Sequence, residues 1–336
     1  MNSSIRVPLL FVFLWSSAYI AVEFSSVHVE PATFVLVRST ITASILLFVL
    51  LITRTDWPKR WEDFNHSIVV GILIHGVYAC GFFAAIFHGI DMVLCALILS
   101  LQPILTTLLS SLFLGEKVTR RKSYGFLAGF LGVSVVILEG NPHQLTLQNA
   151  SDLGAVNDFV AISLCFTALL AISIATIFQK RFCNEIKPIP CVCIQYTAAA
   201  IFMLPFALTL ETLQIDWNLH FVLSLGWLIV FVSIGAMSLL MVLIKRGEAG
   251  SVANLFYLVT PLVALESWIV FDKSITLTAL GGMLLCIVGV VLVNYRPVPK
   301  SDVATSSANG NSICRFVFRN ISVQVDYVNI KRQRRI

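Results

Sequence analysis

Charged residues are scarce in this 336-residue chain: they make up 12% of it, about half the share found in soluble domains. Hydrophobic residues account for 57%, and the mean hydropathy is +0.88. A surface of that composition is too apolar to face water. A soluble globular protein is therefore excluded, and an all-α membrane protein with the lipid bilayer as its main partner is predicted.

Motifs for catalysis or cofactor binding are also missing from the sequence. It has no phosphate loop ending in Gly-Lys, no His-Glu-x-x-His zinc motif and no serine in a strained nucleophile turn. The net charge of +5 does not indicate nucleic-acid binding, because the basic residues lie in short segments between apolar runs. We expect no enzymatic activity, no cofactor, no metal site and no nucleic-acid partner.

The eight cysteines do not form a disulfide or zinc pattern. Four lie inside apolar runs, and the other four fall on the side assigned below to the cytoplasm, where thiols stay reduced. Cys191 and Cys193 are spaced too tightly for the usual zinc pair, and no second pair accompanies them. We interpret the cysteines as small apolar side chains in helix packing.

Ten apolar runs are candidates for membrane helices, since a helix needs about 20 apolar residues to cross a hydrocarbon core of about 30 Å. The first is longer than the apolar part of a signal peptide and is interpreted as a retained helix. The fifth and tenth are short. The predicted helices are Val7–Val27, Thr33–Ile52, Ile68–Phe87, Leu94–Leu114, Tyr124–Leu138, Phe159–Phe178, Val192–Leu210, Phe221–Ile244, Val252–Phe271 and Thr278–Val293.

Basic residues fix the predicted orientation, because cytoplasmic segments are rich in Lys and Arg. With the N-terminus inside, 21 of the 23 basic residues fall in the N-terminus, the inner loops and the tail. The remaining two are Lys273, in an outer loop, and Arg38, in the membrane interior. This alternation supports ten spans with both termini cytoplasmic.

The predicted organisation has two halves and a tail. Residues 7–138 form the first five-helix half and residues 159–294 the second. The segment 139–158, with Gly, Asn, Pro and Asp, is predicted as an external linker between them. Residues 295–336 form a basic cytoplasmic tail, whose charges we interpret as a topology anchor or an attraction to anionic lipid.

The two halves resemble each other internally. Pro103 and Pro261 lie at matching places in the fourth and ninth predicted helices. A pair of glycines seven residues apart recurs in the fifth and tenth helices. An odd number of helices per half requires the halves to be inverted, and inverted repeats with interrupted helices are typical of secondary transporters with a site at the membrane midplane. The prolines either line such a cavity or only kink their helices.

The glycines predict close helix packing. Gly125-x-x-x-Gly129 is a small-residue motif that lets two helix backbones approach. We expect the fifth and tenth helices to pack tightly, either against each other or across a homodimer.

Several stretches resemble EamA-type members of the drug/metabolite transporter superfamily. In the first half they are His75-Gly-Val-Tyr78, the run from Ala96 to Pro103, and Leu114-Gly-Glu-Lys117. In the second half the run from Arg246 to Pro261 is the most specific. The resemblance covers residues 7 to 294, with one departure: Phe271-Asp272 stands where members often have Phe-Gly-Glu.

This resemblance implies ten helices in two inverted repeats around a central cavity. It also implies transport, since members mostly export small metabolites, amino acids or drugs. The family motifs mark the fold and do not identify a substrate.

Three charged residues are candidates for an outer gate or for charge recognition. Arg38 lies about six residues, or ~9 Å, into its helix, and a charge at that depth needs a partner. Glu23 and Glu266 lie at a similar depth. Arg38 either binds an anionic substrate group, pairs with a carboxylate such as Glu23, or extends to the interface. Glu266 is also a candidate for coupling transport to a proton gradient.

Five polar or aromatic side chains are candidates for the cavity wall, together with the two prolines. His75, Gln102 and Tyr257 can hydrogen-bond a substrate or can satisfy helix packing instead. Tyr78 shares the stretch of His75, and Trp227 can supply an aromatic wall or an interfacial anchor.

The sequence therefore predicts a secondary transporter in a bacterial inner (plasma) membrane, exporting a small molecule by alternating access. Uptake by the same fold, or an intramembrane enzyme or scaffold without transport, are the alternatives. The matched prolines and the inverted repeat favour transport, because an enzyme does not require them.

Overall fold

The computed structural model of the chain describes residues 3–115, 119–139, 152–183, 185–246, 255–272 and 276–294. These residues are helical apart from loops and one isolated bridge between Val29 and Ile215. The cytoplasmic tail and most of the linker predicted from the sequence lie outside the described residues.

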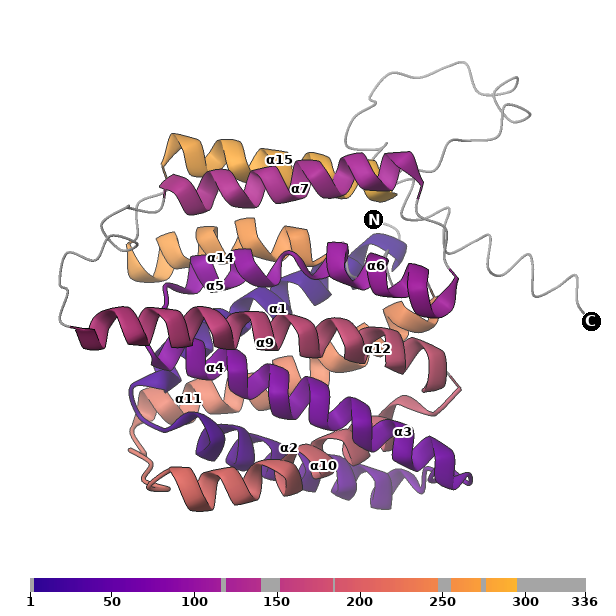
Figure 1. Cartoon of the computed structure of the whole chain (residues 1–336). Coiled ribbons are helices and arrows are strands. Elements are labelled where there is room, and N and C mark those ends of the chain that lie inside the picture. Colours follow the sequence, from indigo (N-terminus) through magenta and orange to yellow (C-terminus); the bar gives the residue numbers. More distant parts are fainter. Residues whose placement is uncertain are drawn as a thin grey trace, which may run out of the picture.

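The helices run roughly along one common direction and form a bundle (Figure 1). Two of them, η1 and η2, are π-helical stretches within longer helices. In chain order the elements are α1 (Ser3–Ser26), α2 (Pro31–Thr53), α3 (Trp61–Gly71), η1 (Ile72–Tyr78), α4 (Ala79–Phe87), α5 (Met92–Leu99), α6 (Gln102–Leu114), α7 (Arg120–Glu139), α9 (Asp152–Phe182), α10 (Pro188–Leu210), α11 (Leu219–Trp227), η2 (Leu228–Ala236), α12 (Met237–Arg246), α14 (Phe256–Phe271) and α15 (Leu277–Asn294).

Seven spans among the described residues are long and apolar enough to cross a membrane, and two shorter apolar helices follow at 258–271 and 280–289. The predicted all-α membrane class is thereby confirmed. The count of ten membrane helices and the side on which the termini lie stay predictions.

Two predicted helix starts differ most from the structure. The third span begins at Trp61 instead of Ile68, because its polar first turn continues the helix before the apolar run. The helix predicted from Phe159 begins at Asp152, within the segment predicted as linker. Apolar runs mark the part of a helix that lies in lipid, whereas polar turns extend the helix beyond the hydrocarbon core.

The two prolines behave differently in the structure. The fourth predicted helix is broken into α5 and α6 at Ser100 and Leu101, and Pro103 lies in the first turn of α6. There its missing N–H costs nothing, since first-turn N–H groups have no intrahelical partner. Pro261 lies inside the unbroken α14. The matched prolines therefore do not produce matched interruptions.

Two helix pairs bound the bundle, and each joins equivalent helices of the two predicted halves. Helices α7 and α15 lie side by side at one edge of Figure 1, and α2 and α10 lie together at the opposite edge. A Cβ atom at Gly289 of α15 would lie 2.7 Å from the carbonyl oxygen of Gly125 and 2.8 Å from the nitrogen of Gly129. The predicted close packing of these helices is confirmed within one chain; the homodimer stays a prediction.

Carboxylates from both halves fasten α2 to α10 where α2 begins. Glu211 accepts hydrogen bonds from the backbone nitrogens of Ala32 and Thr33 at 2.7 and 2.6 Å. Glu30 accepts from the backbone nitrogen and hydroxyl of Thr212 at 2.6 and 2.8 Å. A carboxylate on the free N–H groups of a helix start stabilises it both by hydrogen bonding and through the helix dipole.

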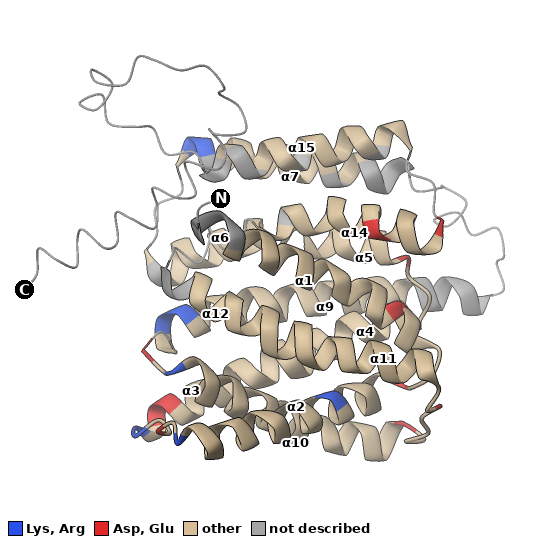
Figure 2. Cartoon of the chain, turned by 180° about the vertical axis from the view of Figure 1, so that it is seen from behind, with Lys and Arg blue, Asp and Glu red and all other residues tan. Residues whose placement is uncertain are grey.

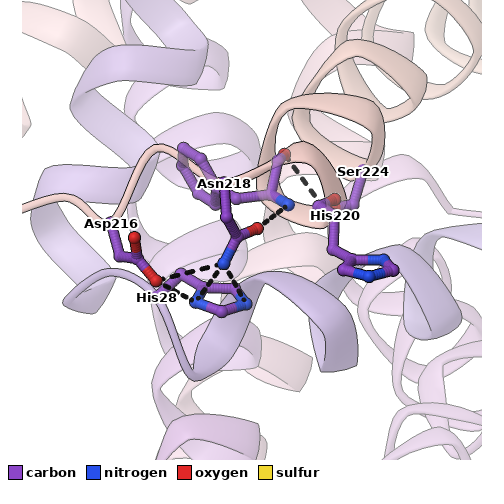
Figure 3. A network of polar contacts seen from close by, with 6 residues as sticks. His28, Asp216, Asn218, His220 and Ser224 are labelled. Carbon is purple, nitrogen blue, oxygen red and sulfur yellow. Dashed lines mark hydrogen bonds and ion pairs between the residues drawn. The ribbon is translucent and has the colours of Figure 1, made fainter.

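Further polar contacts close both ends of this pair of helices. In Figure 3, His28 lies against Asp216 and Asn218, with His28 Nδ1 3.0 Å from the Asp216 carboxylate. At the far end, Lys187 donates to Asp56 at 3.0 Å, and this contact holds the pKa of Asp56 below its ordinary value. The α2–α10 pair is thus tied at each end.

Charged residues lie mostly at the two ends of the bundle, and the blue basic segments lie mainly at the end that holds the N-terminus (Figure 2). The middle of the bundle is nearly free of them. The ends therefore face water or headgroups, and the middle suits a hydrocarbon core.

Candidate functional site

A cavity opens between helices of both halves in the middle of the bundle. Its volume is about 30 Å³, which leaves room for no more than one or two water molecules in this conformation. The lining side chains are mostly aromatic or aliphatic, with one cation among them. They are Trp15, Ala18, Tyr19, Arg38, Ile74, His75, Tyr78, Ala79, Phe82, Tyr196, Val232 and Met237. Apolar walls with few polar groups are typical of small-molecule sites.

The two π-helical stretches both form part of this cavity. His75 and Tyr78 belong to η1, and Val232 belongs to η2. Each stretch lies in the middle of the third helical span of its half. Extended π-helical turns are rare and often occur at functional sites, because the extra residue shifts the side chains and frees backbone groups. The structure thus has a matched irregularity in both halves, although not at the prolines.

Arg38 reaches the cavity from α2 and is held by η2. Its Nε donates to the hydroxyl of Ser233 at 2.9 Å. Within the described part of the chain, no carboxylate lies in ion-pair distance of the guanidinium. The pairing with Glu23 considered from the sequence is therefore not found there.

His75 and Tyr196 stack face to face across the cavity wall. Their ring centroids are 3.8 Å apart and the planes differ by 23°. The Tyr196 hydroxyl lies close to Arg38 and Ser233 but makes no hydrogen bond of ordinary geometry. His75 Nε2 is buried and likewise has no hydrogen-bond partner among the described residues.

An aromatic cluster that includes Tyr78 also lines the cavity. Tyr78 stacks against Trp15 with centroids 6.3 Å apart, and Tyr19 meets Phe82 edge to face at 4.7 Å. Phe256 of α14 packs edge-on against Trp15 at 5.0 Å. The cavity is therefore bounded on one side by rings that are themselves held by their neighbours.

The other predicted cavity residues lie elsewhere or outside the description. Gln102 is buried away from the cavity and donates to the hydroxyl of Thr176 at 3.4 Å. Trp227 donates to Ser17 at 2.9 Å. The side chain of Tyr257 lies outside the described residues.

Neither Pro103 nor Pro261 lines the described cavity. The residue before the second proline, Thr260, donates to the backbone oxygen of Ala96 at 3.2 Å and so fastens α14 to α5. These prolines mark a contact between the halves instead of the cavity wall.

Neither candidate carboxylate lies in ion-pair distance of Arg38 in the described structure. Glu266 on α14 accepts a hydrogen bond from Ser16 of α1 at 2.7 Å, and its second oxygen is buried without a partner in the described residues. Glu23 lies near the end of α1 in a surface depression that also includes Asp91. The three candidates therefore do not form one gate in this conformation.

Four residues of the site were not anticipated from the sequence: Trp15, Tyr19, Tyr196 and Ser233. In the sequence each is one polar or aromatic residue inside an apolar run. Tyr196 and Ser233 could have been found from the sequence, because each places a polar group inside an apolar run. Trp15 and Tyr19 could not, because their sequence context is the same as that of aromatic residues that only pack.

The sequence matches the model of the EamA-like transporter family twice, over residues 4–138 and 159–295. A Bacillus subtilis (strain 168) protein named uncharacterized transporter YvbV is 25% identical over 298 residues, which cover 87% of this chain and 92% of that protein. An uncharacterized transporter of Archaeoglobus fulgidus is 24% identical over 84% of this chain and 96% of its own length. A solved crystal structure is similar in fold, with a TM-score of 0.67 at 17% identity, over 87% of this chain and 97% of that one.

Proposed function

The chain belongs to the EamA-like transporter family, and from this premise we propose that it is a secondary transporter that exports a small metabolite, amino acid or drug by alternating access. It is an integral multi-pass membrane protein. The observation that carries the proposal is the cavity between the two halves, whose walls include a π-helical stretch from each.

The packing of the helices supports two rigid units that can move relative to each other, the pair α2–α10 and the pair α7–α15. The helix pairs α2–α10 and α7–α15 are tightly packed, and the hydrogen-bonded loops described above fasten the first of them at both ends. The π-helical stretches lie between these pairs. Packed pairs can move as rigid units, whereas a π-helical turn can revert to an α-helix with little loss of backbone hydrogen bonding.

For the membrane setting, we propose ten spans with both termini in the cytoplasm of a bacterium. The matching of both halves to one family model supports the five-plus-five count. The gathering of basic segments at the end that holds the N-terminus supports the orientation.

Glu266 is proposed as the group that couples transport to protons. It is an intramembrane carboxyl group whose hydrogen-bond donor is the neutral Ser16, with no cation in ion-pair distance among the described residues. Ser16 follows Trp15 of the cavity wall, so a change at Glu266 can alter how α1 packs beside the cavity. Intramembrane acidic residues commonly act as proton carriers.

Metabolite profiling of cells that express or lack the gene tests the proposed function. Export predicts that at least one small molecule accumulates in the medium of expressing cells and inside cells that lack the gene. Proteoliposomes then test the same molecule directly. An unchanged profile, with no flux in proteoliposomes, contradicts the proposal, and the opposite distribution indicates uptake.

A further inference from the structure

We infer that the cavity, once it widens from its present volume of about 30 Å³, binds a small organic anion, a carboxylate with an aromatic or apolar body, with Arg38 as its charge partner. This inference rests on the proposed function, since it names the substrate class of the same site. It comes from three features of the cavity: an uncompensated cation, two buried polar atoms without partners, and a wall of aromatic rings.

The first feature is the charge balance. Among the described residues that line the cavity, Arg38 is the only charged side chain. Its Nε donates to Ser233 and the Tyr196 hydroxyl lies close by, but the two terminal nitrogens make no hydrogen bond of ordinary geometry among the described residues. A guanidinium stays protonated in proteins, so the described part of the cavity wall carries one positive charge. A carboxylate from outside supplies the missing counter-charge and fits the two terminal nitrogens side by side.

The second feature is a pair of unsatisfied polar atoms beside that charge. The Tyr196 hydroxyl and His75 Nε2 are both buried without a hydrogen-bond partner in the described structure. Both side chains line the cavity, and their rings are stacked. A buried polar atom without a partner costs about 1–3 kcal/mol, so such atoms are rare unless a ligand or water completes them. The phenol O–H, and Nε2 when it carries the proton, are donors suited to an anion.

The third feature is the rest of the wall. Trp15, Tyr19, Tyr78 and Phe82 form a continuous aromatic surface in the cavity wall. Their contacts with one another hold the rings in place, which reduces the ordering cost of binding. This surface suits a flat or apolar body attached to the carboxylate. A cationic substrate is disfavoured, because it would lie close to Arg38 in a low-dielectric site.

Binding to the purified full-length protein in detergent tests the inference. The probes are benzoate, phenylacetate and indole-3-acetate, each compared with its own amide, and benzylamine as a cation of similar body. We expect at least one carboxylate to bind with about tenfold or higher affinity than its amide, and benzylamine not to bind. Equal binding of every carboxylate and its amide, or preferential binding of benzylamine, overturns the inference.

Two variants assign the binding to the named atoms. Arg38→Gln is expected to lower carboxylate affinity about tenfold or more and to remove the preference over the amide. Tyr196→Phe removes a hydroxyl without an internal partner, so it should weaken carboxylate binding several-fold while thermal stability stays unchanged or rises. If Arg38→Gln does not fold, Tyr196→Phe still decides: carboxylate binding equal to wild type contradicts the inference.

The outcomes separate this inference from the proposed function. Carboxylate binding without transport in proteoliposomes would remove the transporter proposal and leave the anion site. Transport of a neutral or cationic compound that carboxylates do not inhibit would contradict the anion site and leave the transporter proposal standing.

Discussion

Gly71→Ala is expected to lower the free energy of unfolding by about 3 kcal/mol, at the upper end of the range for overpacking a protein interior. A Cβ atom at Gly71 would lie 2.3 Å from the carbonyl oxygen of Gln195 and 2.5 Å from its Cα. These are backbone atoms of α10, so no side-chain rotation can relieve the clash. The helices must separate, and the cavity residues on η1 and α10 separate with them.

The chain offers a matched control in the other half. Gly226 lies close before η2, as Gly71 lies directly before η1, but a Cβ atom there meets nothing within 4 Å. Gly226→Ala should be neutral or slightly stabilising, since alanine favours a helix over glycine by about 1 kcal/mol. Thermal unfolding of both purified variants measures the difference. A Gly71→Ala protein as stable as wild type would mean that α3 and α10 do not approach as described.

Glu266→Gln is expected to abolish the response of transport to an imposed pH gradient while leaving exchange of unlabelled for labelled substrate intact. The amide has nearly the shape of the carboxyl group and can still accept the hydrogen bond from Ser16. Unlike a carboxylate, it does not take up a proton in the pH range in which proteins are stable. The measurement is flux of the molecule found by profiling, in proteoliposomes with and without a pH gradient.

Two controls separate proton binding from packing. Glu23→Gln removes a carboxyl group near the end of α1 and should leave the pH response unchanged. Ser16→Ala removes the hydrogen bond and keeps the carboxyl group, so the response should persist. A full pH response in the Glu266→Gln protein would exclude Glu266 as the coupling group.

The sequence predicted the helical membrane class and the positions of most spans well, because apolar runs of about 20 residues are typical of membrane-spanning helices. His75 and Tyr78, which the sequence offered as cavity candidates, line the described cavity together with Arg38, which it offered for an outer gate or for charge recognition. The close packing of the fifth and tenth helices followed from glycine spacing alone, since no other residue permits backbones to approach so closely.

The remaining features depend on contacts between distant segments. Gly71 is one glycine without a motif, and only the position of Gln195, 124 residues further on, makes it irreplaceable. The π-helical stretches are apolar like the α-helices that flank them, so hydropathy does not mark them. The prolines were the visible irregularity, but Pro103 begins a helix and Pro261 lies inside one.

The central claim is that the cavity opens in turn to both sides of the membrane, and cysteine labelling tests it without knowledge of the substrate. Ala79, which lines the cavity, is replaced by cysteine in a chain whose eight native cysteines have been removed. The same substitution at Ala85, which is fully buried, is the control. With a membrane-impermeant maleimide applied to right-side-out and inside-out vesicles, we predict labelling of Ala79→Cys from both sides and none of Ala85→Cys. Labelling of Ala79→Cys from one side only, or from neither, would contradict alternating access.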